Sequence, residues 1–268
     1  MSPTFVEELL DRIMEGTMIP KVQIERAVGP ILGMFLAEVL METLKDDADL
    51  SGPMVVICPE FPLKKQDNRQ STNIDWLLLN SQRHQLIFLE LKTSDTSMGG
   101  DQDAIYKEKK EAVARQGASF LIADLKLLRD ASSEHGKYDY VLQERVLPLE
   151  EEISLCREAK IVYLVPKAAT SKVGSQADRV LSFSQLATTI SHDYAQEWGV
   201  IRDRLCQLDV STRATRNQKH LDAVTQRGTV NYAGIEDFDS ILTRCHRDGD
   251  RVVVGFFGGV RELMDSEL

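Results

Sequence analysis

The sequence lacks the closely spaced cysteines and the long apolar runs that mark many zinc-binding, secreted or membrane proteins. Its four cysteines are Cys58, Cys156, Cys206 and Cys245, and none belongs to a Cys-x-x-Cys pair. Zinc and iron–sulfur sites usually have closely spaced ligands, so we interpret these residues as reduced core or surface thiols. No run approaches the roughly 20 apolar residues of a membrane span. The N-terminal stretch carries early acids and no basic region, so we expect no secretory signal, no membrane partner and a cytoplasmic protein.

An excess of positive charge is also missing. The chain has 42 acidic and 32 basic side chains, which gives a formal net charge of −10. This balance argues against a protein coated with basic surface for sequence-blind binding to DNA. It does not exclude nucleic acid as a partner, because an enzyme needs only a local basic groove and metal-binding carboxylates add to the negative total. The length of 268 residues favours one domain, or one domain with a substantial extension.

Short apolar runs predict the strands of a central sheet. The runs cover residues 54–58, 74–79, 86–91 and 161–165. Residues 80–83 form a short polar link between two of them, which predicts a hairpin and makes the second and third strands antiparallel neighbours. Residues 61–73, by contrast, read as a long charged link.

Helical periodicity flanks these strands. The first helical pattern covers residues 22–45, and Gly29-Pro30 within it predicts a kink or a break. The second covers residues 101–129, and residues 130–140 are typical of a loop. The resulting order is helix, strand, strand, strand, helix, strand, which packs naturally as a mixed α/β sheet with helices on its faces.

The last third of the chain carries weaker signals. Helices are predicted at 186–208 and 232–246, and a strand is predicted at 251–257. We therefore divide the chain into a core at residues 1–166 and a C-terminal α/β extension at residues 167–268. The sequence does not decide whether this extension packs on the same domain, nor whether the protein forms a homo-oligomer.

Asp75 and Glu90 are acids inside otherwise apolar strands. Burying such carboxylates is costly unless they are paired, hydrogen-bonded or bound to a metal. If the hairpin pairs the two strands, Asp75 lies beside Glu90, and Lys92 shares the face of Glu90. Two carboxylates, a backbone carbonyl such as that of Leu91, and waters are ligands that Mg²⁺ accepts. A nearby lysine can orient an attacking water or stabilise charge on a phosphate, as phosphodiester hydrolysis requires.

Gln102 and Tyr106 lie four residues apart at the start of the second predicted helix. This spacing places both side chains on one helix face. Because that helix follows the Glu-Leu-Lys strand, the two polar groups can reach back to the metal site or to a phosphate.

The segment STNIDWLLLN, followed by QLIFLELKTSD and QDAIY, resembles the PD-(D/E)xK nuclease superfamily. The closer likeness is to the subset with a Gln-x-x-x-Tyr motif, as in the nuclease domains of bacterial recombination helicases. The resemblance covers roughly residues 20–166 and implies a restriction-endonuclease-like core, αβββαβ, with a mixed central sheet flanked by helices. It also implies that Asp75 and Glu90 bind the metal, Mg²⁺ or Mn²⁺, that Lys92 is the catalytic lysine, and that Gln102 and Tyr106 support the site.

The match departs from the family pattern at two points. Ile74 stands where the family name has proline, and the further acid that the family often carries on its first helix is ambiguous. Glu38 is our first choice for that acid, Glu60 the next, and Glu25 is the remaining candidate.

The expected function is therefore metal-dependent hydrolysis of DNA phosphodiesters by a Mg²⁺-dependent nuclease. The alternative is a non-catalytic DNA-binding or protein-interaction module on the same fold. A third reading is hydrolysis of RNA or another phosphate-containing substrate, because the metal chemistry is shared. We interpret Trp76, beside Asp75, as core on the opposite sheet face rather than as a platform for stacking bases.

Overall fold

A computed structural model of the chain describes residues 4–16, 23–65, 70–94, 101–210, 251–256 and 259–264, the last two ranges as backbone only. The chain divides into two compact units, Met1–Arg216 and Asn217–Leu268. The second unit contains strand β6 (Arg251–Phe256), which pairs with the antiparallel strand β7 (Gly259–Met264). The strand predicted at 251–257 is thus confirmed over its described part, whereas the helix predicted at 232–246 lies outside the described residues.

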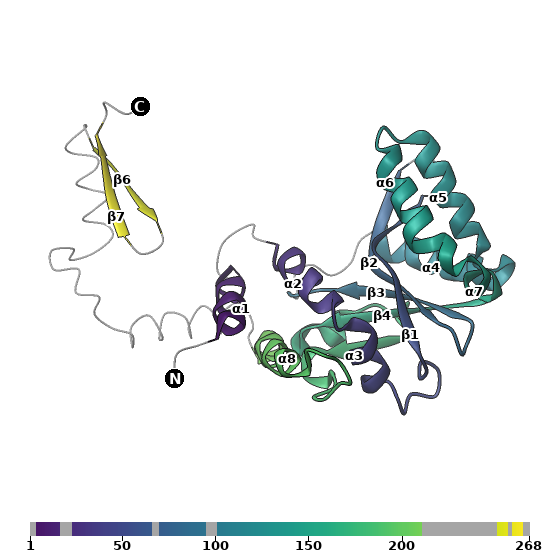
Figure 1. Ribbon diagram of the computed structural model, residues 1–268, viewed down its shortest axis with the longest axis horizontal. Helices are drawn as coiled ribbons and strands as arrows, with labels where there is room; N and C mark the ends of the chain where they lie inside the picture. Colours follow the sequence, from purple (N-terminus) through teal and green to yellow (C-terminus); the bar gives the residue numbers. More distant parts are fainter. Residues whose placement is uncertain are drawn as a thin grey trace. The chain divides into compact units, whose positions relative to one another are not determined.

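A five-stranded mixed sheet with the order β1-β2-β3-β4-β5 organises the first unit (Figure 1). Its strands are β1 (Met54–Lys64), β2 (Ser71–Asn80), β3 (Gln85–Leu91), β4 (Glu158–Val165) and β5 (Arg179–Ser182). Strands β1, β2 and β3 form an antiparallel meander, and β4 and β5 continue it in parallel. The antiparallel hairpin predicted between the second and third strands is confirmed.

Helices cover both faces of this sheet (Figure 1). One face carries α2 (Ile24–Gly33), α3 (Leu36–Thr43) and α8 (Ala195–Val210), with α1 (Phe5–Glu15) packed on α8. The other face carries α4 (Asp101–Gln116), α5 (Ser119–Ala131), α6 (His135–Tyr140) and α7 (Glu150–Leu155). The buried hydrophobic residues accordingly form two cores, one on each side of the sheet. The mixed α/β class with a helix-flanked sheet is as the sequence predicts.

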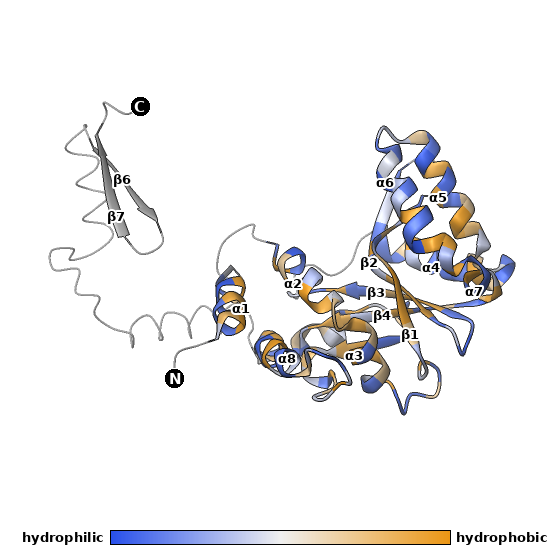
Figure 2. Ribbon diagram, in the orientation of Figure 1, coloured by the Kyte–Doolittle hydropathy of each residue, from blue (hydrophilic) through white to orange (hydrophobic). Residues whose placement is uncertain are grey.

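Strand β3 lies at the centre of the sheet, and all of its residues are buried. A strand covered on both faces is apolar nearly throughout, which is visible in the hydropathy of the central strands in Figure 2. Leu78 and Leu89 belong to the core under α2, whereas Leu77 and Phe88 belong to the core under α4. Asp75 is two residues before Leu77 and Glu90 two residues after Phe88, so strand alternation assigns both acids to the α4 face. Trp76 packs in the opposite core against Gly29 and Gly33, as predicted.

The first helical segment breaks later than the sequence predicts. Pro30 lies inside α2, and the helix continues to Gly33 before α3 begins at Leu36. Short-range hydrogen bonds from Met34 N–H to the Ile31 carbonyl (3.3 Å) and from Phe35 N–H to the Leu32 carbonyl (3.0 Å) tighten the last turn. Pro30 removes one backbone donor in the second half of α2, and the burial of Ile24, Val28 and Leu32 on one face of the helix offsets that loss.

The second predicted helix, 101–129, is two helices. Gly117 separates α4 from α5 with a φ of +80°, a left-handed conformation that favours glycine and commonly ends helices. Its N–H closes the last turn of α4 on the Val113 carbonyl at 2.8 Å. The loop predicted at 130–140 is also wrong, because α6 fills most of it and a π-helical segment, Val141–Val146, continues it.

Strands β1 and β2 are longer than the apolar runs that predict them. The two strands pair up to Lys64 and Ser71, and Lys65 N–H bonds the Gln70 carbonyl at 2.9 Å. Phe61 and Leu63 in this extension are buried in the core under α4, so alternate side chains of a segment that reads as a charged link contribute to the core.

The first compact unit also extends past the expected boundary at residue 166. Strand β5, which the sequence analysis misses, pairs with β4, and α8 buries Trp198 and Leu205 in the core under α2. Helix α8 begins at Ala195 rather than near residue 186. Within the described part of the chain, no helix has both the length and the apolar character needed to cross a bilayer.

Candidate active site

The two acids that the sequence singles out lie side by side at one end of the β2–β3 ladder. The β2–β3 register pairs Trp76 with Leu89, so the next position on each strand sets Asp75 opposite Glu90. Backbone pairing between β2 and β3 ends here, and the Asp75 carboxylate takes its place: Oδ2 accepts the Leu91 N–H at 2.6 Å. A buried N–H requires a hydrogen-bond partner. Because the Asp75 carboxylate is the partner of the Leu91 N–H, the backbone pairing can end here without leaving that N–H unpaired.

Glu90 is almost completely buried, with 2% of its surface exposed. Its Oε1 accepts a hydrogen bond from the Lys92 ammonium, which lies on the same face two residues further along. Its Oε2 lies 2.5 Å from the Tyr106 hydroxyl, which comes from α4. Both carboxylate oxygens are therefore held by groups from different elements, and the orientation of the carboxylate is defined.

Gln102 and Tyr106 reach the site together, as their helical spacing predicts. The Gln102 amide donates to the Tyr106 hydroxyl and lies 3.4 Å from Glu90 Oε2. The backbone carbonyl of Asn73 on β2 is a shared acceptor, 3.0 Å from the Gln102 amide nitrogen and 2.9 Å from the Tyr106 hydroxyl. This small network ties the first turns of α4 to β2 and β3.

Burial dominates the electrostatics of the pair of acids. Burial raises the pKa of Asp75 from 3.8 to about 7, and the charge of Glu90 adds to the effect, against a lowering by the Leu91 N–H. Burial likewise raises the pKa of Glu90, although the adjacent Lys92 ammonium and the Tyr106 hydroxyl oppose the rise. Charged carboxylates in this place cost free energy, and a neighbouring cation would recover it.

The Lys92 ammonium is held in its charged form. Burial favours the neutral amine, but the Glu90 carboxylate outweighs burial, so the pKa of Lys92 lies above its ordinary value. The charges of Asp75 and Glu25 act in the same direction. The Lys92 backbone N–H bonds the Leu164 carbonyl at 2.9 Å, which fixes the residue to β4 at the edge of the site.

Of the three candidates for a further acid, Glu25 lies next to Lys92 and its neighbour Thr93. Its Oε1 accepts both the backbone N–H of Thr93 (3.0 Å) and the Thr93 hydroxyl (2.8 Å), so α2 is joined to the end of β3. Glu60 lies exposed on β1, where its carboxylate receives the Asn73 side-chain amide at 3.4 Å.

Glu38, our first choice from the sequence, is not brought to the site. It makes no hydrogen bond or ion pair with the described residues of the site. Helix α3 leads into the start of β1, and Met54 there is paired with Asn80, at the far end of β2 from Asp75. Glu25, in the first turn of α2, therefore lies at the carboxyl end of β3, and Glu38 of α3 does not.

The residues present fit a hard divalent cation in type and placement. Asp75 and Glu90 offer carboxylate oxygens on one face. The N–H and the C=O of a strand residue face the same neighbouring strand, so the Leu91 carbonyl is directed toward the side of Asp75. Among the described residues, no group of three or more histidine, cysteine, aspartate or glutamate side chains is placed to share a metal. A cation here would accordingly rely on two carboxylates, a carbonyl and waters, which is a coordination that Mg²⁺ accepts.

Two residues of this region escaped the sequence analysis. Tyr163 on β4 is in register with Glu90, and its hydroxyl donates to the carboxylate of Asp103, the residue after Gln102. Nothing in the sequence distinguishes Tyr163 from an ordinary core aromatic residue of an apolar strand. Asp103 could have been found, because it is an acid directly beside Gln102 at the start of a predicted helix.

Comparison of the chain with protein-family models, with curated proteins and with solved structures gives no match. The chemistry of the site therefore has to be inferred from its own residues.

Proposed function

We propose that this protein is a magnesium-dependent nuclease that hydrolyses phosphodiester bonds in DNA, with a site of the PD-(D/E)xK type. The observation that carries the proposal is the convergence of Asp75, Glu90 and Lys92 at one end of two paired strands, with Gln102 and Tyr106 of α4 on the same carboxylate. Residues that are separate in the sequence meet in one buried, polar cluster.

Asp75, Glu90 and the Leu91 carbonyl would hold the metal. Mg²⁺, or Mn²⁺ in its place, supplies positive charge that stabilises negative charge developing on a phosphate. The raised pKa values of both acids support this assignment, because an added cation favours the ionised carboxylates.

Lys92 would act on the water or on the phosphate. Its ammonium is bound to Glu90 Oε1, within the cluster and close to Asp75. From this position it can orient an attacking water or donate a hydrogen bond to a phosphate oxygen whose charge grows in the transition state. Because Glu90 and Asp75 keep the amine protonated in the structure, charge stabilisation is the role that its present state supports.

Tyr106 and Gln102 would hold the Glu90 carboxylate in place. Oxygen Oε2 of Glu90 is engaged by the hydroxyl and lies near the amide, and both groups are anchored on the Asn73 carbonyl. Fixed ligand orientation is a general requirement of metal sites, and such supporting groups commonly affect affinity or activity by about 10–100-fold.

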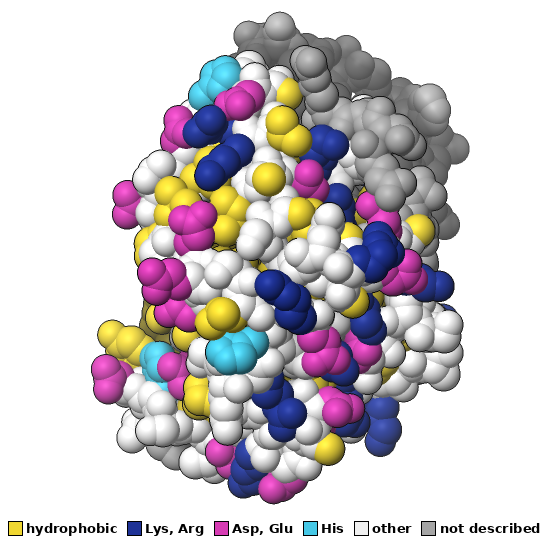
Figure 3. Space-filling model, turned by 90° about the vertical axis from the view of Figure 1, so that its right-hand side faces the viewer, with side chains coloured by type: hydrophobic (Ala, Val, Ile, Leu, Met, Phe, Trp, Pro, Cys, Tyr) yellow, Lys and Arg dark blue, Asp and Glu magenta, His cyan; other side chains and the backbone are white. Residues whose placement is uncertain are grey.

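The space-filling view of the α4–α7 side shows basic and acidic side chains interspersed rather than gathered into one basic field (Figure 3). This surface pattern agrees with the net charge of −10. It supports a substrate strand that is held locally at the site, in preference to broad sequence-blind binding on this face.

The test is cleavage of labelled single-stranded and double-stranded DNA with Mg²⁺, with Mn²⁺ and with EDTA. We expect cleavage that depends on the metal, that disappears in Lys92→Ala, and that persists in Lys126→Ala, a matched change at an exposed lysine of α5. Intact DNA with wild-type protein under every metal condition would refute the nuclease.

Two further outcomes separate the alternatives. If the protein binds DNA without cleaving it, and calorimetry detects no binding of Mn²⁺, a non-catalytic module on this fold is favoured. Cleavage of RNA and not of DNA would keep the metal site and change the substrate, because the metal chemistry is shared.

A further inference from the structure

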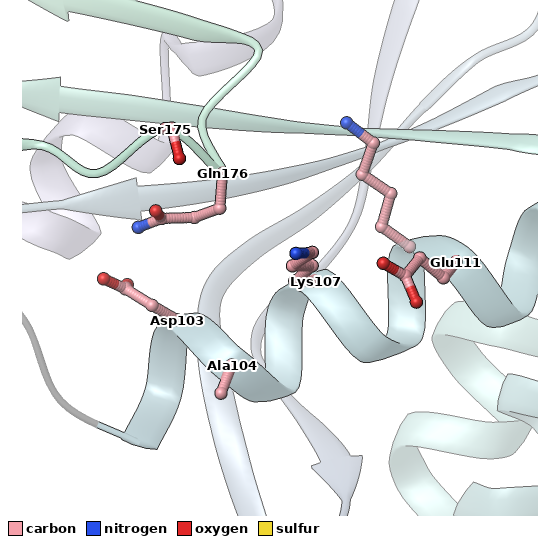
Figure 4. Close-up of a pocket in the computed structure, with 7 residues that line it drawn as sticks. Asp103, Ala104, Lys107, Glu111, Ser175 and Gln176 are labelled. Atoms are coloured by element: carbon pink, nitrogen blue, oxygen red, sulfur yellow. The ribbon is translucent and has the colours of Figure 1, made fainter.

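A hollow of about 370 Å³ opens beside the candidate active site. It is lined by α4 on one side and by the segment between β4 and β5 on the other (Figure 4). The lining residues are Asp103, Ala104, Lys107, Lys110, Glu111, Ser175 and Gln176. This volume lies within the range of small-molecule sites, roughly 300–1,000 Å³.

Asp103 connects the hollow to the catalytic cluster through neighbouring residues. Asp103 follows Gln102, which lies against Glu90, and Asp103 also receives the hydroxyl of Tyr163. Tyr163 is the residue of β4 in register with Glu90. A group bound between Asp103 and Gln176 would therefore lie one residue along α4 from Gln102, which reaches the Glu90 carboxylate.

The two lysines that line the hollow differ in whether they form an ion pair. Lys110 is committed to the fold, because its ammonium lies 2.5 and 2.6 Å from the two carboxylate oxygens of Asp178. Lys107 is exposed one turn nearer the active site, and it makes no ion pair or hydrogen bond within the described part of the chain. Lys107 thus has an uncommitted positive charge at the mouth of the hollow, which suits a phosphate.

One end of the hollow presents an acceptor and a donor. Figure 4 shows the side chains of Asp103 and Gln176 extending toward this end. Asp103 is a carboxylate, and the buried Gln176 Nε2 lies near the Tyr163 hydroxyl but makes no hydrogen bond of good geometry to it. A buried donor without a partner is costly, so a ligand acceptor at this place would be favourable.

We propose that this hollow is a subsite for one nucleotide of the substrate strand, next to the scissile phosphodiester. Lys107 binds a backbone phosphate, Asp103 accepts a hydrogen bond from an N–H group on a base edge, and Gln176 donates to an oxygen or ring nitrogen beside it. Cytosine and adenine present an exocyclic amine beside an acceptor, and an unpaired thymine presents its ring N–H beside a carbonyl oxygen, so each of these bases fits. The subsite rests on the proposed nuclease function, and it adds contacts to the base next to the cleaved bond.

The experiment measures the binding of fluorescent 12-mers of deoxycytidine and of deoxythymidine at pH 7.5 with Mg²⁺. It uses full-length protein with Lys92→Ala, so that the DNA stays intact, and adds the subsite changes to this background. The background protein should bind both strands. Asp103→Ala should weaken binding of both strands by roughly threefold or more, although it removes a negative charge that by itself opposes DNA binding.

Lys107→Ala should weaken binding of both strands by roughly three- to tenfold and lower the slope of log affinity against log salt by about 0.7. Its matched control is Lys126→Ala, and neither affinity nor slope should change there. Ala104→Trp, which fills the hollow, should weaken binding, whereas Ala123→Trp on the exposed side of α5 should not. Thermal unfolding of each variant checks that the fold is kept.

The outcomes separate the two proposals. Equal binding by Lys107→Ala, Ala104→Trp and their controls overturns the subsite, even if the wild-type protein cleaves DNA. Absence of any binding to either strand by the background protein also overturns it. Loss of binding in Lys107→Ala and Asp103→Ala with the expected salt slope, combined with no cleavage by the wild-type protein, supports the hollow as a DNA-binding site and refutes the nuclease.

Discussion

Replacing Asp75 by asparagine tests whether this acid is kept for chemistry or for stability. The asparagine side chain has nearly the same shape, and its oxygen can still accept the Leu91 N–H that Asp75 accepts at 2.6 Å. What the change removes is a charge in a largely apolar place. If Asp75 serves a metal, the folded protein without metal should become more stable once the charge is gone.

The sign and size follow from the pKa of Asp75. Burial, with a contribution from the charge of Glu90, raises it from 3.8 to about 7, so the folded state holds this proton more tightly than the unfolded state. Stability of the wild-type protein from this group therefore falls as the pH rises from about 4 to about 7, and stays low above that. The shift corresponds to at most about 4 kcal/mol. Because Asp75 is partly exposed, we expect about 1–3 kcal/mol after solvent screening.

The assay is thermal and urea unfolding of wild type and Asp75→Asn at pH 8.5 and at pH 5, each in EDTA and in Mn²⁺. In EDTA at pH 8.5 the variant should unfold roughly 2–10 °C higher than wild type. At pH 5 the difference should shrink, because the wild-type carboxyl is then protonated in the folded state. Mn²⁺ should stabilise the wild type at pH 8.5 and leave the variant unchanged.

A variant less stable than wild type in EDTA at pH 8.5 would refute this reasoning. That result would mean that the Asp75 carboxylate contributes more through its contacts than its burial costs, as in an ordinary structural ion pair. The matched change Asp139→Asn, at an exposed acid that pairs with Arg129 at 3.4 Å, should alter stability by less than about 1 kcal/mol at either pH.

Further predictions address the support of the site and one turn of the fold. Tyr106→Phe removes the buried hydroxyl beside Glu90 and should lower the free energy of unfolding by about 1–3 kcal/mol in urea titrations, with a loss of nuclease rate beyond that of an equally destabilised variant. Glu25→Gln should reduce cleavage at limiting Mn²⁺, whereas Glu38→Gln should not; equal rates for both would show that the carboxylate of α2 is only structural. Gly117→Ala should destabilise the protein by about 1–2 kcal/mol because its φ is +80°, and unchanged urea midpoints would contradict the helix break.

The core of the site could be predicted from the sequence because it obeys local rules. An acid inside an apolar strand is conspicuous, and strand alternation with a short hairpin fixes which acids can meet. Asp75 and Glu90 follow these rules, and the four-residue spacing of Gln102 and Tyr106 gives a helix face directly.

What could not be predicted depends on tertiary geometry. Choosing Glu25 over Glu38 requires knowing that α2, and not α3, begins near the carboxyl end of β3. Strand β5 is short and stands out only once β4 offers it a parallel edge. The break at Gly117 had a local signal in the glycine itself, but the periodicity of α4 continues into α5 and masks it.

Charge balance connects these observations. The cluster buries the acids Asp75 and Glu90 against a single ammonium, that of Lys92, which is bound to Glu90. One carboxylate is therefore left without a cationic partner, and it is Asp75 whose pKa rises to about 7. Apolar residues at these two positions would stabilise the folded sheet more than the acids do, since burying uncompensated charge opposes folding. A divalent cation supplies the missing charge, so the same imbalance that weakens the protein without metal is what would make the site bind one.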